Sequence, residues 1–307
     1  MIDKRVLTEL LSDYAKETPD SLCIKCENRN YSYRDVEEIT NGIAAIMVRM
    51  GATKNCSIGI IGQRTELIPF FILSILKIGA RMVPLNNSFP KERIRYICSD
   101  ASVEMILADE NYCNEMSSCT NLLVICFSID SLTTLKTSAS FEHQCSFSDV
   151  MAIYYTSGTS GPPKGVVHTH QSVMTSNYYD YIEFGFTPED CILLYTHWSI
   201  CFSITAFAVF YSGGSICISS ERYCSDLFAL DEYISSNKIT VIHMPTQVGF
   251  QFSQLSEVDS IRLLILGGSS FPKLPKPVKY DIINIYGSTE GMALAYQKCN
   301  ISHTNSS

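Results

Sequence analysis

Short apolar runs alternate with helix-patterned segments along most of this chain, and no other feature constrains its fold so strongly. A helix is predicted over residues 4–16, and buried strands are predicted at residues 57–61, 80–85 and 105–107. Runs that are apolar on both faces are typical of parallel strands covered by helices. The sequence therefore predicts an α/β protein with layered, mostly parallel sheets and flanking helices.

The second half of the chain repeats this style without any internal sequence repeat. Further strands are predicted at residues 192–195, 215–218, 241–244, 263–266 and 282–286, and a helix at residues 226–234. One unit, residues 1–296, is predicted, followed by a polar tail over residues 297–307 that has no apolar period.

Composition excludes several classes of protein. The 307 residues are 46% hydrophobic and 18% charged, which is typical of a globular chain and not of a disordered one. A net charge of −8 argues against a nucleic-acid binder, which would present a basic surface. The longest apolar stretch, residues 200–218, is interrupted by Ser, Thr and Gly, so no membrane span is predicted. The charged N-terminus has no signal-peptide core, and a cytoplasmic protein is expected.

Thirteen cysteines are scattered through the chain, and only Cys23 and Cys26 form a C-x-x-C pair. A structural zinc site would need a second pair at suitable spacing. Buried or free thiols in a reducing compartment are therefore expected.

Residues 154–165 form a loop that is rich in Gly, Ser and Thr and carries a lysine, Lys164, near its end. Such a loop offers backbone N–H groups, hydroxyls and an ammonium group to one small volume, which suits a polyphosphate. Gly165 follows Lys164, where a P-loop would have Ser or Thr, so this is not a Walker A motif. A solvated surface loop would have the same composition. The candidate phosphate-binding residues are Thr156, Ser157, Gly158, Thr159, Ser160, Gly161 and Lys164.

Two later segments suit a purine. Gly267 and Gly268 lack a Cβ, so a flat adenine could approach the backbone there. Tyr286 could stack on the base, and Asn284 could pair with its exocyclic amine. The alternatives are an ordinary turn after a strand and a core tyrosine at a strand end.

Thr289 and Glu290 follow the last predicted strand, at the end where α/β proteins bind ligands. A carboxylate oxygen suits Mg²⁺ bound to ATP phosphates. A solvated loop carboxylate is the alternative for Glu290.

These segments together resemble the adenylate-forming superfamily, which includes acyl-CoA synthetases, adenylation domains of nonribosomal peptide synthetases and luciferases. The loop is similar to the superfamily's Tyr-Thr-Ser-Gly-Thr-Thr-Gly-x-Pro-Lys-Gly signature, with Ser160 in place of the second Thr of the Thr-Thr pair. Four more segments resemble its motifs in the same order: residues 18–34, 76–85, 266–272 and 284–290. The resemblance implies adenine contacts from Gly267, Gly268, Ser269, Asn284, Tyr286 and Gly287, and phosphate or magnesium contacts from Thr289 and Glu290.

The resemblance implies ATP and Mg²⁺ as reactants, and a carboxylic acid that becomes an acyl-adenylate. CoA or a phosphopantetheine carrier protein would then accept the acyl group. Ser199, Ile200, Phe202 and His243 are the candidate acyl-pocket residues. Ile200 takes the place of the Asp that pairs with a substrate α-amine in amino-acid-activating members, and a buried unpaired ammonium is costly. An acid with an apolar body is therefore expected, as in an acyl-CoA synthetase of fatty acid metabolism.

Members of this superfamily continue into a barrel subdomain and a C-terminal lid domain, which carries an adenylation lysine. Glu290 is followed by 17 residues (307 − 290). We therefore expect a partial adenylation domain, and no catalytic residue can be assigned. Two alternatives stay open: a catalytically silent nucleotide-binding module, and an adenylation unit that loads an amino acid or a β-alanine-like acid onto a carrier protein.

Overall fold

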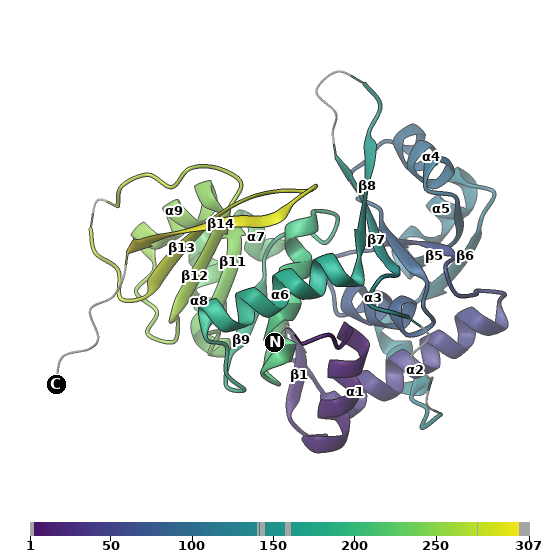
Figure 1. Ribbon diagram of the computed structural model, residues 1–307, viewed down its shortest axis with the longest axis horizontal. Coiled ribbons are helices and arrows are strands. Elements are labelled where there is room, and N and C mark those ends of the chain that lie inside the picture. Colours follow the sequence, from purple (N-terminus) through teal and green to yellow (C-terminus); the bar gives the residue numbers. More distant parts are fainter. Residues whose placement is uncertain (1–2, 140, 142–144, 157–160, 275, 301–307) are drawn as a thin grey trace.

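The computed structural model describes residues 3–139, 141, 145–156, 161–274 and 276–300. It contains two sheets with parallel central strands, and antiparallel strands occur only at sheet edges (Figure 1). The predicted α/β fold with mostly parallel sheets is confirmed. Within the described residues, none of the helices has the length and apolar character that a membrane span requires.

The larger sheet has the strand order β14-β13-β12-β11-β9-β10-β1-β2. Its strands are β1 (Leu22–Cys26), β2 (Arg29–Ser32), β9 (Cys191–Leu194), β10 (Ser215–Ile218), β11 (Val241–Pro245), β12 (Leu263–Gly267), β13 (Asp281–Ser288) and β14 (Met292–Asn300). The smaller sheet has the order β6-β5-β3-β4-β7-β8. Its strands are β3 (Ser57–Ile61), β4 (Arg81–Pro84), β5 (Val103–Asp109), β6 (Leu123–Phe127), β7 (Val150–Thr156) and β8 (Lys164–Thr169).

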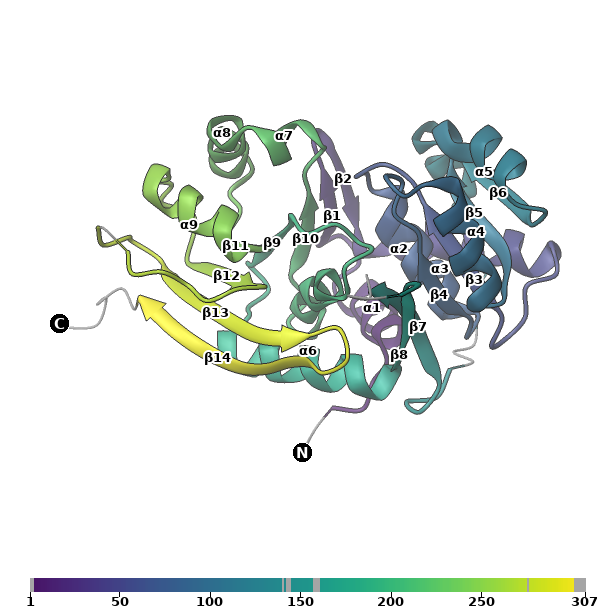
Figure 2. The same cartoon turned by 90° about the horizontal axis from the view of Figure 1, so that it is seen from above.

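Helices cover both faces of both sheets, as parallel strands require (Figure 2). The α-helices are α1 (Leu7–Glu17), α2 (Tyr33–Arg49), α3 (Leu67–Lys77), α4 (Lys91–Asp100), α5 (Cys113–Cys119), α6 (His170–Phe184), α7 (Arg222–Ser225), α8 (Leu227–Asn237) and α9 (Thr246–Leu255). Three 3₁₀ segments are η1 (Glu110–Tyr112), η2 (Ile129–Leu135) and η3 (Cys201–Tyr211). Helices α8 and α9 pack on the outer face of the larger sheet, and α4 and α5 on that of the smaller sheet.

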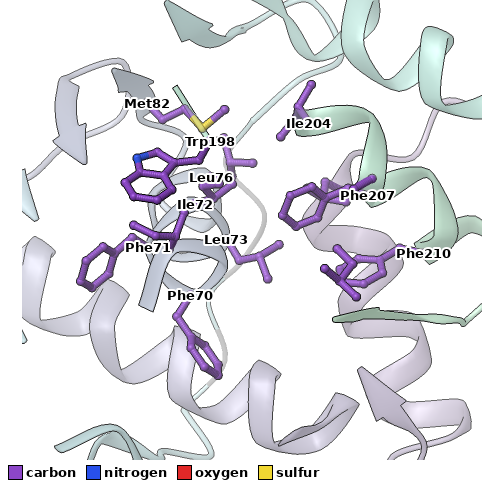
Figure 3. Packing of buried hydrophobic residues seen from close by; sticks show 14 of the residues in the cluster. Phe70, Phe71, Ile72, Leu73, Leu76, Met82, Trp198, Ile204, Phe207 and Phe210 are labelled. Carbon is purple, nitrogen blue, oxygen red and sulfur yellow. The ribbon is translucent and has the colours of Figure 1, made fainter. Parts of the chain in front are cut away.

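A shared hydrophobic core fills the layer between the two sheets, where α1, α2, α3, α6 and η3 lie. Helix α3 is buried all round, which is typical of a helix enclosed by other elements. Figure 3 shows its side chains Phe70, Ile72 and Leu76 in one cluster with Trp198 and Phe207. The core thus joins the two sheets into one packed unit.

The polar tail predicted from residue 297 is wrong for its first four residues. Strand β14 continues to Asn300 and pairs antiparallel with β13, with Lys298 opposite Ile283. An edge strand gains backbone hydrogen bonds from one neighbour even where its side chains show no apolar period. Residues 301–307 lie outside the described part of the chain.

The cysteines also differ from the sequence prediction at one place. Cys113 and Cys126 form a disulfide, with their Cα atoms 5.9 Å apart. Helix α5 packs back on strand β6, and this brings the two residues together although 13 positions separate them. The C-x-x-C pair, Cys23 and Cys26, consists of buried free thiols.

Candidate functional site

A pocket of about 330 Å³ opens at the carboxyl ends of the strands in the larger sheet. Ligands in open α/β sheets bind at this edge, because loops from several parallel strands meet there. The last residues of three neighbouring strands line the pocket: Pro245 of β11, Gly267 of β12 and Ser288 of β13. Its remaining lining residues are Thr196, Ile200, Cys201, Phe202, Thr205, Gly268, Ile285, Gly287, Thr289, Met292 and Ala293.

The predicted adenine-binding residues divide into two groups. Gly267, Gly268 and Gly287 line the pocket. Gly268 has φ +102°, a backbone conformation that favours glycine, and the space beside it is open. Asn284 lies beneath the pocket, where its amide nitrogen donates a 3.0 Å hydrogen bond to the carbonyl of Ser269. The Asn284 side chain therefore fixes the turn that follows β12.

Ser269 and Tyr286, the two remaining predicted adenine-binding residues, do not line the pocket, and Tyr286 is 72% exposed. Its ring lies free for stacking, in contrast to the core tyrosine that was the alternative.

The predicted phosphate-binding residues lie on two separate segments. Thr289 lines the pocket, and the exposed Glu290 follows it in the β13–β14 connection. Lys164 is the first residue of β8 and pairs with Thr156 of β7, and the two strands are antiparallel neighbours (Figure 1). Neither Lys164 nor Thr156 lines the pocket, and Lys164 is exposed. Residues 157–160 lie outside the described part of the chain.

The base of this strand pair nevertheless reaches the pocket. His168 of β8 lies against the backbone of Thr289, and burial lowers the pKa of its imidazole. The smaller sheet therefore contacts the β13–β14 connection at the point where Thr289 and Glu290 lie.

The four predicted acyl-pocket residues lie close together on the segment after β9 and on β11. Ile200 and Phe202 line the pocket, and Ile200 is 50% exposed. Ser199 lies beside them and contacts Nδ1 of His197 at 2.7 Å. His243 lies behind the pocket, with its ring centroid 3.6 Å from that of Phe202.

Comparison with known protein families gives a match to this chain. The family model for AMP-binding enzymes matches residues 11–306. The chain belongs to the AMP-binding enzyme family. It is 28% identical over 295 residues to tyrocidine synthase 1 of Brevibacillus parabrevis, an alignment that covers 92% of this chain and 26% of that protein. It is also 28% identical over 315 residues to the polyketide synthase PksN of Bacillus subtilis strain 168, covering 95% of this chain and 6% of that protein.

Solved structures share the fold of this AMP-binding domain. The N-terminal subdomain of Klebsiella oxytoca NpsA, in complex with 3-hydroxybenzoyl-AMSN, superimposes with a TM-score of 0.83 at 20% identity, covering 98% of this chain and 77% of that one. The nonribosomal peptide synthetase FmoA3 gives a TM-score of 0.87 at 16% identity, covering 99% of this chain and 34% of that one.

Two imidazoles near the pocket, those of His197 and His243, are held neutral at neutral pH. Burial lowers the pKa of His243 to about 3. Burial, aided by the nearby Arg64 guanidinium, lowers the pKa of His197 to about 4. Neither ring can therefore balance the charge of a substrate carboxylate in this arrangement, although each can still form a hydrogen bond.

Sequence reasoning missed several residues that line or support the pocket. Met292 and Ala293 of β14 form one wall, because the hairpin between β13 and β14 folds back beside the strand ends. Thr205 of η3 forms part of another wall, and Arg64 holds the end of β9 by donating to the Leu194 carbonyl at 2.8 Å. None of them belongs to a Gly-rich or charged motif, so the sequence offers no local signal for them.

Proposed function

We propose that this domain binds MgATP and a carboxylic acid in the pocket at the β11–β13 strand ends, and that it serves the formation of an acyl-adenylate. The convergence of three sequence-distant segments on one pocket carries the proposal. Ile200, the Gly267–Gly268 turn and the Gly287–Thr289 segment all line it. Activation of an acid by ATP needs the carboxylate and the α-phosphorus side by side, so one pocket must hold both reactants.

The backbone supports placing the nucleotide at the end of the pocket near Gly268. The space beside Gly268 is open to a flat base, and Thr289 offers a hydroxyl one residue before the Glu290 carboxylate. Among the described residues, no three His, Cys, Asp or Glu side chains gather as a metal site. A lone exposed carboxylate fits a Mg²⁺ ion that arrives with the ATP phosphates, which supply most of its ligands.

The apolar residues Ile200 and Phe202 support placing the acid at their end of the pocket. Ile200 offers no charge to an α-ammonium group, so a standard α-amino acid is disfavoured. One relative is by name a polyketide synthase, and the similar solved structure FmoA3 is by name a nonribosomal peptide synthetase, which supports a carrier protein over CoA as the acceptor. CoA as acceptor and a catalytically silent nucleotide-binding module are the competing proposals.

Isothermal titration calorimetry with MgATP, followed by ATP–pyrophosphate exchange over a panel of carboxylic acids, tests the proposal. We expect MgATP binding that weakens about tenfold in Glu290→Gln, because one charged contact to the metal is lost. Glu257→Gln, which alters a remote carboxylate on the surface, is the matched control. Binding without exchange on any acid would favour the silent module. Absence of MgATP binding in the folded wild-type domain would refute the proposal.

A further inference from the structure

A buried carboxyl group lies behind the pocket, and the proposed function does not use it. Asp180, on α6, is 2% exposed, and the hydroxyl of Tyr296 on β14 donates a 2.7 Å hydrogen bond to its Oδ1. Among the described residues, no Lys, Arg or His side chain forms an ion pair with it. A buried carboxyl without a cation is costly, and such groups are retained where they bind something.

Asp180 lines a small enclosed cavity of about 10 Å³, which holds about one water molecule. His243 and Thr205 are the other polar residues around it. The rest of the lining is apolar, from Phe184, Phe186, Ile192, Ala206, Ile265 and Ile285. The cavity is therefore lined mainly by apolar side chains, with a small polar region formed by Asp180, His243 and Thr205.

This cavity lies next to the main pocket and shares part of its wall. Thr205 and Ile285 line both spaces. Phe202, which lines the main pocket, packs against His243, which lines the cavity. A ligand that enters from the strand ends and extends past Phe202 would reach Asp180 with its far end.

His243 provides an independent sign that a ligand group belongs there. Its side chain is 2% exposed, and Nδ1 has no hydrogen-bond partner. Its Nε2 lies 3.4 Å from the hydroxyl of Thr205, at the limit of a hydrogen bond. Buried polar atoms are rarely left unpaired, so a buried, unpaired nitrogen on a residue that lines the cavity favours a hydrogen-bonding group there.

We propose that Asp180 and His243 form the far end of the acid pocket and select a carboxylic acid that carries a small hydrogen-bond donor, an amine or a hydroxyl, at the end remote from its carboxyl group. This inference rests on the proposed function, since it assigns a substrate class to the same pocket. Ile200 disfavours an amine beside the reacting carboxyl, whereas Asp180 favours a donor at the opposite end. The size of the cavity limits the donor to a group of about one heavy atom.

Calorimetric titrations in the presence of MgATP test this with two matched series of acids. One series is hexanoate, 6-hydroxyhexanoate and 6-aminohexanoate, and the other is benzoate, 3-hydroxybenzoate and 3-(aminomethyl)benzoate. In at least one series we expect a donor-bearing acid to bind about tenfold more tightly than its parent, as for a hydrogen bond to a charged group. The hydroxyl and amine members distinguish the two kinds of donor.

The Asp180→Asn variant should reduce that advantage to about threefold or less for the amine, because the amide carries no charge. Glu183→Gln is the matched control, because it changes an exposed carboxylate on the same helix, and it should leave every dissociation constant unchanged. Circular dichroism establishes that both variants fold.

If the wild type binds MgATP but no donor-bearing acid binds better than its parent, the inference is wrong while the proposed function stands. Asp180 would then serve only to anchor β14 to α6. Loss of MgATP binding itself would instead remove the proposed function.

Discussion

The buried carboxyl of Asp180 makes a quantitative prediction about stability. Burial raises its pKa to about 7 from an ordinary value of 3.8, although the hydrogen bond from Tyr296 acts in the opposite direction. Each pKa unit corresponds to about 1.4 kcal/mol, so this group lowers the free energy of unfolding by about 4 kcal/mol once both states are ionised. The folded state holds the proton while the unfolded state has released it. Stability is therefore lost as the pH rises from about 4 to about 7.

His243 has an effect of the opposite sign over part of the same window. Burial lowers its pKa to about 3 from 6.5. Between these two pH values the imidazole is protonated in the unfolded state and neutral in the folded state. Its contribution to stability therefore rises with pH up to about 6.5. The pH dependence of the wild type alone sums both effects, and a difference between two proteins is needed to isolate Asp180.

Asp180→Asn provides that difference, because the amide oxygen can still accept the hydrogen bond from Tyr296. We expect the variant's stability relative to wild type to increase by about 4 kcal/mol between about pH 4 and about pH 8. Urea unfolding followed by circular dichroism at several pH values measures it. A difference that is independent of pH, or one that grows toward acid pH, would refute the reasoning.

Two further predictions concern contacts outside the pocket. Glu66→Gln should lower the free energy of unfolding by about 2 kcal/mol at pH 7, since the fully buried carboxylate pairs with Arg29. Burial alone would raise the Glu66 pKa, but the Arg29 hydrogen bond lowers it below 4.5, so the deficit should shrink as the pH falls below about 4.5 in urea titrations. Gly213→Ala should cost about 2 kcal/mol by the same assay, because φ is +77° and a Cβ would lie 2.6 Å from the Tyr14 ring. Equal stability of either variant and wild type at pH 7 would contradict its prediction.

The strands of the fold could be predicted from the sequence where burial is complete. Ser57–Ile61 and Leu263–Gly267 are mostly apolar, and every residue in them is buried, because helices cover both of their faces. Helix α6 was missed, because its polar and apolar residues follow no single face. Strand β14 (Met292–Asn300) was missed completely, because pairing with β13 and not side-chain pattern defines it.

The candidate site shows the same division. Gly267, Gly268 and Thr289 could be identified because each belongs to a short sequence motif. The two glycines lack a Cβ, and Thr289 precedes a carboxylate at the end of a predicted strand. Asp180 could not be identified, because its partner Tyr296 is 116 positions away and only the packing of α6 against β14 joins them. A buried acid on a helix looks in sequence like any solvated one.

The core shared by the two sheets has a spectroscopic consequence. Trp198 is the single tryptophan of the chain, and it lies 4% exposed in the layer between the sheets (Figure 3). Trp198 follows β9 of the larger sheet in the sequence. Its indole nevertheless packs among side chains of α3, a helix that lies against the smaller sheet. Its fluorescence therefore has one origin, and a red shift of the emission reports the separation of the two halves from each other.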